Sequence, residues 1–176
     1  MLDRTAGFGQ EQTFHYPASR RLMDDVQIHH ALKMFDTAST SAHEAAWASL
    51  KPLGVSVVPF LAEYFPHTKK AQGRVALIFH AIRFARESEA AFELGLLALN
   101  DKATLVRYRA CGLCAYSLRK DAIPHLERLL EHADEKTVDD ARAAIDAIRR
   151  KNHHYFIDRS HSNSTFWEVN PKDARY

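Results

Sequence analysis

Two cysteines, Cys111 and Cys114, stand at a spacing that could support redox chemistry. In a thioredoxin-like site the first cysteine lies at a helix N-terminus, where the helix dipole favours the thiolate. Here both cysteines fall inside a helix predicted over 104–118, well past its start. A four-thiolate zinc site would need a second Cys-x-x-Cys pair, and the sequence has none. We expect two small thiols packed between helices, with a redox or metal role as the alternative.

Histidines are the other residues that could do chemistry, and they include two adjacent pairs. These are His29-His30 and His153-His154, and His161 follows the second pair. A metal needs three or four converging ligands, and His161 with one of its neighbouring pair could supply two. No residue pattern fixes a third ligand, and no Ser/His/Asp order or paired carboxylates suggest a catalytic centre. We therefore predict no metal, no cofactor and no catalytic residues.

The elements that position these residues are predicted to be helices. Pro59 and Pro124 each stand in the first turn of an apolar pattern with helical spacing. Their separation implies a unit of about thirty residues, the length of a helical repeat. The same spacing predicts that Phe79, Leu97 and Leu105 point into the core. The predicted helices are 17–35, 41–50, 56–65, 70–86, 88–99, 104–118, 121–132 and 137–151.

Together these patterns predict an all-α fold, a short right-handed α-solenoid of antiparallel helix pairs over 17–151. Residues 1–16 are polar and contain glycine, which predicts a flexible N-terminal arm. Residues 152–176 change character. Tyr155-Phe156-Ile157 and 165–169 are aromatic and β-branched, which predicts a small C-terminal β-hairpin packed on the last repeat as a cap.

Composition and charge set limits on the function. A formal net charge of +2 is too small to demand a nucleic-acid or membrane partner. No basic-then-apolar leader opens the chain, and no apolar run approaches the roughly twenty residues of a membrane span. Two cysteines without a secretory signal favour a reducing compartment. We therefore expect a cytoplasmic protein with no membrane partner.

The pattern resembles HEAT-like repeats. The residues that carry the resemblance are 45–61, 101–107 with Ala110, 121–126 and 134–148. In that family an Asp before the first helix of a repeat and a Val-Arg pair inside it tie adjacent repeats together, and Asp101 with Val106-Arg107 are similar. The tail, 155–171, resembles the endings of small bacterial HEAT-like proteins, some of them toxin-neutralising immunity proteins.

The resemblance implies that the second helix of each pair lines a concave face. In this sequence those helices are mostly acidic, which predicts a non-catalytic module that binds a basic protein partner. Within that class we expect an immunity protein that neutralises a bacterial toxin by occluding it. The predicted partner-binding residues are Phe60, Glu63, Tyr64, Glu89, Glu93, Glu127, Arg128, Glu131 and Trp167.

Two alternatives remain at the level of sequence. The first is a nucleic-acid-binding HEAT-like protein or a DNA glycosylase-like enzyme, which would use basic residues on the first helices. An acidic lining repels phosphates, so a nucleic-acid partner is disfavoured. The second is a bilin-lyase-like protein or an assembly chaperone. A di-iron site is not expected. HEAT-like deoxyhypusine hydroxylases bind di-iron through several His-Glu pairs, whereas this chain has only His43-Glu44.

Overall fold

Local sequence signals place most of the helix starts in the computed structural model, which describes residues 23–173. Asp24, Ser39, Ser88 and Asp134 each accept a backbone N–H of the helix that follows, which satisfies a donor that the first turn leaves free. The predicted arm 1–16 lies outside the described residues. The elements are α1 (Asp25–Lys33), α2 (Thr40–Leu50), η1 (Lys51–Val57), α3 (Val58–Tyr64), η2 (Phe65–His67), α4 (Ala71–Ile82), α5 (Glu89–Ala98), α6 (Thr104–Ser117), η3 (Lys120–Ala122), α7 (Ile123–Glu127), η4 (Arg128–Glu131), α8 (Glu135–Arg149), η5 (His153–Phe156) and η6 (Pro171–Asp173).

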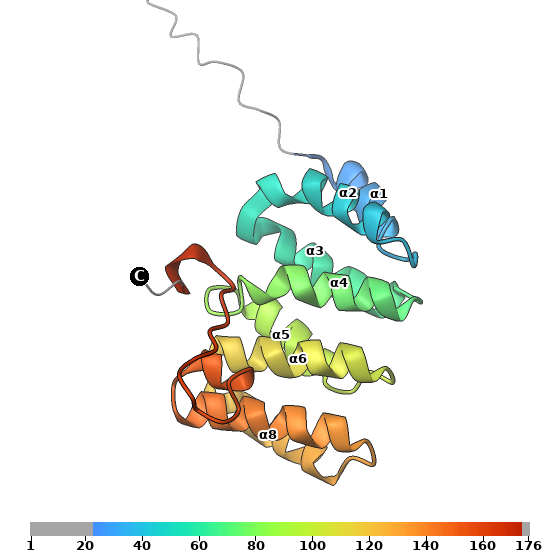
Figure 1. The fold of residues 1–176 in the computed structure, drawn as a ribbon. Coiled ribbons are helices and arrows are strands. Elements are labelled where there is room, and N and C mark those ends of the chain that lie inside the picture. Colours follow the sequence, from blue (N-terminus) through green and yellow to red (C-terminus); the bar gives the residue numbers. More distant parts are fainter. Residues whose placement is uncertain (1–22, 174–176) are drawn as a thin grey trace, which may run out of the picture.

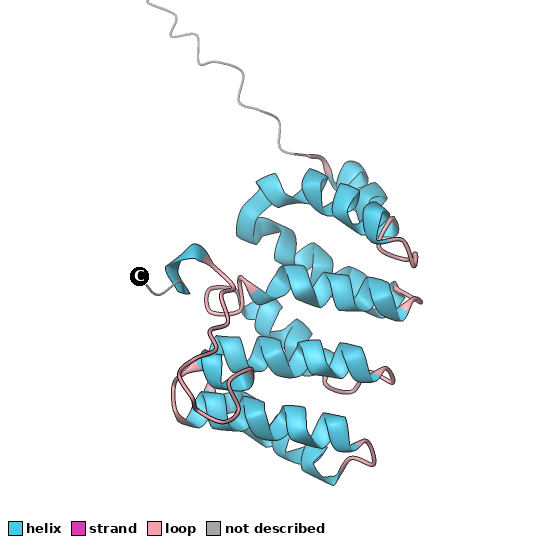
Figure 2. Cartoon of the chain, in the orientation of Figure 1, coloured by secondary structure: helices cyan, strands magenta, loops and turns pink. Residues whose placement is uncertain are grey.

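The helices are arranged in two layers. Helices α2, α4, α6 and α8 follow one another as one layer, and α6 packs against both α4 and α8 (Figure 1). Helix α5 packs on α6 from the other layer and contacts α3, while α7 packs on α8. Pro59 and Pro124 lie in the first turns of α3 and α7, as predicted. The all-α prediction is confirmed for residues 23–173 (Figure 2).

The core confirms the helical periodicity but not every side chain assigned to it. Leu77, Ile78 and Leu113 are fully buried between the layers. The predicted burial of Phe79, Leu97 and Leu105 is wrong, because these side chains are 47%, 52% and 54% exposed. A helix buries only one stripe of its surface. A large apolar residue next to that stripe can therefore face outward. Phe79 of α4 and Leu105 of α6 therefore lie at the protein surface.

Within residues 23–173 one helical stretch, Thr40–His67, is long and apolar enough to cross a membrane, judged by length and composition alone. This differs from the prediction that no apolar run approaches that length. Gly54 breaks the stretch with φ 58° and ψ −137°, a conformation that glycine adopts without a steric penalty. Leu50 and Leu61, on either side of the break, are fully buried in the core. Core helices pass the same test, so the stretch is weak support for a membrane span.

The predicted C-terminal β-hairpin is wrong for the part of the chain that the structure describes. Tyr155 and Phe156 lie in the 3₁₀ turn η5, and 165–169 has no regular secondary structure. No strand occurs between residues 23 and 173. The segment packs on the preceding helices, since η5 contacts both α6 and α8.

Side chains accept backbone N–H groups both between the two expected strands and within the second one. Between the strands, the carboxylate of Asp158 accepts the N–H groups of Ser162 at 3.1 Å and Asn163 at 2.7 Å. Within the expected second strand, the N–H of Trp167 donates to Nδ1 of His154 at 3.0 Å, and that of Val169 donates to the carboxylate of Asp173 at 3.3 Å. The bonds of Trp167 and Val169 compete with strand pairing, because each one removes a donor from a possible ladder.

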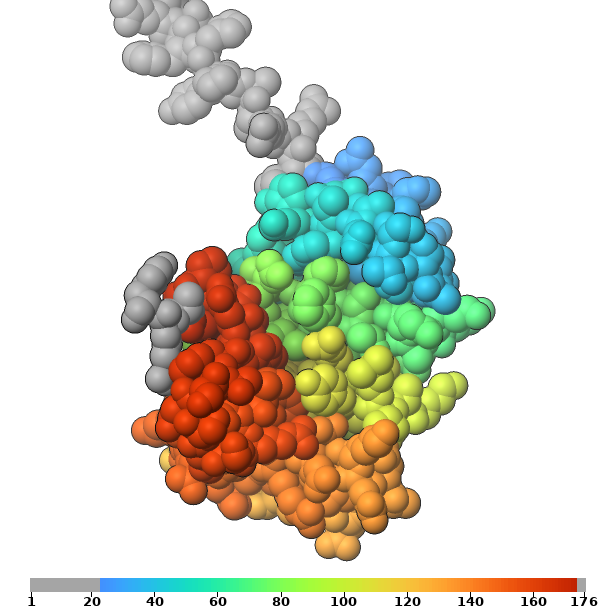
Figure 3. All heavy atoms as spheres, in the orientation of Figure 1, coloured from blue at the N-terminus to red at the C-terminus, as the bar shows by residue number. Residues whose placement is uncertain are grey.

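The C-terminal segment forms a continuous block against the helices, coloured red in Figure 3. Its aromatic side chains Phe156 and Trp167 approach Gly112 of α6. A Cβ atom at Gly112 would lie 3.1 Å from Phe156 and 3.3 Å from Trp167. The hydroxyl of Tyr116 donates to Asp173 at 2.9 Å. A glycine on α6 thus provides the space in which the tail docks.

Candidate functional site

The predicted acidic surface lies on α3, α5 and η4, the layer opposite α4, α6 and α8. Glu63, Glu93 and Glu131 are exposed and form no ion pair with any residue in 23–173. We call these three residues the acidic row. Their charges are free to meet a cation from outside the chain.

Two further predicted glutamates already have partners within the chain. Glu89 accepts a hydrogen bond from Arg119 at 2.5 Å, and Glu127 accepts one from Arg149 at 2.9 Å. These pairs are largely exposed, so each contributes little to stability. They nevertheless neutralise part of the predicted acidic lining. The surface is therefore less acidic than a count of its glutamates implies.

The predicted aromatic anchors Phe60 and Tyr64 are half-buried on α3. The ring of Phe60 lies edge-on to His29, with 6.1 Å between ring centroids. Burial, and then the charge of Asp36, raises the pKa of Tyr64, so its hydroxyl stays protonated and can donate a hydrogen bond. Arg128 is exposed and, within residues 23–173, forms no ion pair. These side chains remain available at the surface beside the acidic row.

Trp167, the last predicted anchor, lies apart from this layer. Its ring packs at 5.5 Å from that of Phe156 and at 6.0 Å from that of Tyr116. It belongs to the block formed by the C-terminal segment on α6. Trp167 was predicted to be a partner-binding residue, but the structure places it in the C-terminal segment and not on the layer that carries the acidic row.

Both cysteines are fully buried within α6. Burial raises the pKa of Cys114 to about 12 and raises that of Cys111 well above its ordinary value. A thiol with a raised pKa is a poor nucleophile and a poor metal ligand, because both roles need the thiolate. The expected packing of two thiols between helices matches this placement.

Both histidines of the second pair, His153 and His154, are buried and form hydrogen bonds. A guanidinium nitrogen of Arg86 donates to Nδ1 of His153 at 3.0 Å, so Nε2 carries the proton that it donates to the Trp167 carbonyl at 3.0 Å. Burial, and then neighbouring His154, lowers the pKa of His153 to about 4. Between residues 23 and 173, no three His, Cys, Asp or Glu side chains gather in a way that could hold a metal ion.

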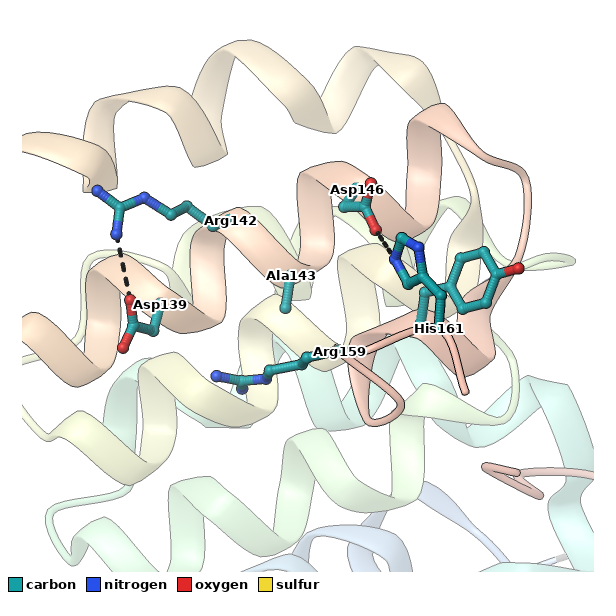
Figure 4. A pocket seen from close by; sticks show the side chains of 7 residues that line it. Asp139, Arg142, Ala143, Asp146, Arg159 and His161 are labelled. Carbon is teal, nitrogen blue, oxygen red and sulfur yellow. Dashed lines mark hydrogen bonds and ion pairs between the residues drawn. The ribbon is translucent and has the colours of Figure 1, made fainter. Parts of the chain in front are cut away.

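A cavity of about 420 Å³ lies between α8 and the C-terminal segment (Figure 4). Nε2 of His161 lies 2.6 Å from the carboxylate of Asp146, and the His161 ring stacks on Tyr155 at 4.1 Å. Arg142 donates to Asp139 at 3.2 Å on the same wall. A His-Asp pair can activate a hydroxyl or thiol, but Ser, Thr and Cys are missing from the residues that line this cavity. The contact between His161 and Asp146 connects the C-terminal segment to α8.

Five of the eleven basic residues predicted for the outer surface are paired with carboxylates: Arg74, Arg86, Arg107, Arg149 and Arg150. Arg74 donates two hydrogen bonds to Asp101, at 2.6 Å and 3.0 Å, and Arg107 donates to Asp134 at 2.8 Å. Both arginines are buried. A charge engaged in this way is not available to a phosphate backbone.

Arg83 and Arg109 are the two arginines of this basic cluster without an ion pair in residues 23–173, and the sequence could not single them out. Both line one cavity between α4, α6 and the tail. Which arginine meets a carboxylate depends on contacts between helices distant in sequence. In the sequence, Arg83 and Arg109 could be recognised only as two members of the basic cluster on the first helices.

No family model, curated protein or solved structure matches the chain.

Proposed function

We propose that this chain is a non-catalytic protein-binding module of the HEAT-like helical-repeat type. Its acidic row, Glu63, Glu93 and Glu131, would bind a basic protein partner. The observation that carries the proposal is that these three exposed carboxylates lack a cation within residues 23–173 and lie on one layer with half-buried Phe60 and Tyr64.

The repeat character of the proposal is supported by a recurring contact. Arg74 reaches Asp101, and Arg107 reaches Asp134, each across 27 residues of chain. Asp101 and Arg107 are among the residues that carry the resemblance to HEAT-like repeats, and Asp134 begins another of its stretches. Layers of stacked helix pairs present extended surfaces, which suit protein partners better than small substrates.

Within this class we propose an immunity protein that blocks a toxin by steric and electrostatic occlusion. Exposed charges of one sign accelerate the encounter with an oppositely charged partner more than they strengthen the final complex. Nucleases have basic surfaces that meet nucleic acid, so a nuclease toxin would match the acidic row. Blocking of this kind needs no turnover and no catalytic residue.

Charge reversal of the acidic row tests the proposal. The variant carries Glu63→Lys, Glu93→Lys and Glu131→Lys, and both it and the wild type are used to capture proteins from the source cell for mass spectrometry. We expect the wild type to retain a basic protein whose affinity, measured with the purified partner, falls by at least about tenfold in the variant. The wild-type affinity should also fall as salt is raised.

A matched control reverses three other exposed carboxylates that also form no ion pair within residues 23–173: Glu44, Glu87 and Glu135. This control has the same net charge as the row variant. We expect it to retain the partner. Equal loss in both triple variants would mean that only net charge matters, and capture of an acidic partner would refute the role of the row.

The nucleic-acid alternative finds less support in the geometry. Arg74 and Arg107 of the basic cluster are buried and held by carboxylates. A protein that binds DNA tightly needs free cations that can release counterions from the backbone. Fluorescence anisotropy with duplex DNA at low and moderate salt separates the two functions, because tight, salt-sensitive binding would favour the nucleic-acid alternative.

A further inference from the structure

A partly open cavity of about 180 Å³ lies where α4, α6 and the C-terminal segment meet. Arg83, directly after the end of α4, and Arg109 of α6 both line it. Trp167 and Val169 from the tail supply apolar lining, and Glu168 supplies the carboxylate among the lining residues. Two guanidinium groups thus converge on one small space.

Neither arginine has an anionic partner. Among the arginines in residues 23–173, only Arg83, Arg109 and the exposed Arg128 form no ion pair. The Nε atoms of Arg83 and Arg109 are also shielded from solvent and have no hydrogen-bond acceptor. Buried donors are nearly always satisfied in folded proteins, so two orphaned donors beside one cavity point to a missing acceptor.

Aromatic rings hold both guanidinium groups in place. Arg83 lies 5.6 Å from the ring centroid of Trp47, and Arg109 lies 5.3 Å from that of Phe79 and 5.5 Å from that of Tyr108. A stacked guanidinium has lost much of its rotamer freedom before a ligand arrives. Binding an oxyanion therefore costs less entropy here than at a free surface arginine.

A second cavity, of about 350 Å³, adjoins the first along α4 and α6. Phe79 and Arg109 line both cavities. The second is mainly apolar, with the exposed side chains of Phe79 and Leu105 on its wall. His80, only 8% exposed, also lines it, and its Nδ1 has no hydrogen-bond partner. An apolar space with an unpartnered polar atom is typical of a small-molecule pocket.

We propose that these two cavities together bind a small organic anion. A phosphate or carboxylate group would lie between Arg83 and Arg109, and an aryl or similar apolar body would lie against Phe79 and Leu105. The arginine forks match the oxygens of either head group. This site uses α4 and α6 and is independent of the acidic row.

Two carboxylates of the site oppose an anion: Glu44, which lines the larger cavity, and Glu168. Glu168 lines the same cavity as the two arginines, and it forms no ion pair with any residue in 23–173. It competes with a bound anion for the two guanidinium groups. Removing its charge by Glu168→Gln should therefore tighten anion binding.

Intrinsic fluorescence offers a direct readout, because the chain has two tryptophans and both adjoin the site. Trp47 lies under Arg83, and Trp167 lines the cavity. The probes are phenyl phosphate, phenylacetate, inorganic phosphate and phenol, titrated into the full chain and checked by calorimetry. We expect saturable binding of at least one aryl anion, weaker binding of inorganic phosphate, and none of phenol. The tighter of phenyl phosphate and phenylacetate identifies the head group.

Variants test the assignment of the arginines. Arg83→Gln and Arg109→Gln should each weaken binding of the aryl anion by at least about tenfold. Arg128→Gln, on the opposite layer, should leave it unchanged, and Glu168→Gln should strengthen it several-fold. Arg83→Lys keeps the charge but loses the fork, and it replaces Arg83→Gln if that variant does not fold.

Three results would overturn the proposal. The first is no saturable signal with either aryl anion. The second is an Arg128→Gln effect as large as that of Arg83→Gln. The third is inorganic phosphate binding as tightly as phenyl phosphate, because the apolar cavity would then have no part in the site.

Discussion

A guanidinium nitrogen of Arg107 lies 2.8 Å from the carboxylate of Asp134, and the pair joins the start of α6 to the loop before α8. The hydroxyls of Thr104 and Thr137 also donate to this carboxylate, at 2.7 Å and 3.0 Å. Arg107 in turn donates to the backbone carbonyl of Asp101 at 2.8 Å. One buried arginine thus fixes the starts of α6 and α8, neighbours within one layer, relative to each other.

The carboxylate of Asp134 should make folding stability depend on pH in the acid range. Hydrogen bonds from Thr104, Thr137, the Lys136 backbone and Arg107 lower its pKa from 3.8 to about 2. The unfolded chain therefore binds the proton more readily than the folded one. The stabilisation is present above about pH 4 and is lost as the pH falls toward 2.

We expect Asp134→Asn to be less stable than the wild type at pH 7 and to lose less stability between pH 4 and pH 2. Asparagine can still cap α8, so the helix start is retained. Urea unfolding at several pH values measures the two curves. Since other carboxylates titrate in this range, the difference between the curves is the quantity of interest. Parallel curves would show that Asp134 is not linked to folding.

The contrast between helices and tail shows what sequence could and could not predict. Pro59, Pro124 and Ser88 mark helix starts through local hydrogen bonding and fixed backbone angles, so single positions were informative. The β-branched and aromatic tail has strand propensity, but the side chains of His154 and Asp173 accept the backbone N–H groups of Trp167 and Val169. That competition depends on three-dimensional placement, which propensity does not contain.

The candidate sites show the same division. The sequence identified the acidic residues of the second helices. It did not show that Glu89 pairs with Arg119, or that Glu127 pairs with Arg149 of a neighbouring helix. The outward direction of Phe79 depends on how α4 is rotated against its neighbours. A rotation of the helix by one residue position decides whether a side chain lies in the core or at the surface. Periodicity alone does not determine the rotation that accurately.

Close packing of α4 against the loop after α1 predicts that Gly73→Ala is strongly destabilising. A Cβ atom at Gly73 would lie 2.0 Å from the backbone carbonyl oxygen of Phe35 and 2.7 Å from Thr68. Because a backbone atom must move, we expect a loss of about 3 kcal/mol, which outweighs a gain of about 1 kcal/mol in helix propensity. Urea unfolding measures the change. Gln72→Ala, exposed on the same helix, is the control and should shift stability by less than about 0.5 kcal/mol.

The buried histidine of η5 predicts a second pH dependence, at milder acidity. His153 has a pKa lowered from 6.5 to about 4, first by burial and then by His154. The folded state thus binds the proton less readily than the unfolded state. The resulting stability is complete above about pH 6.5 and is lost as the pH falls toward 4. Melting temperatures at pH 7 and pH 5 should therefore differ more for the wild type than for His153→Gln. His30→Gln, exposed on α1, should behave as the wild type.

The two thiols of α6 should be almost unreactive while the chain is folded. Cys111 and Cys114 have no exposed surface, and burial keeps the pKa of each thiol high, so little thiolate exists near neutral pH. We expect labelling by Ellman's reagent at pH 8 to be roughly a hundredfold slower in buffer than in urea, because reaction requires local or global opening. Gly95→Ala would place a Cβ atom 2.5 Å from Leu113 and 3.6 Å from the Cys114 sulfur. That variant should open α6 more often and label faster. Rapid labelling of both cysteines in the folded wild type would instead restore a redox role for the pair.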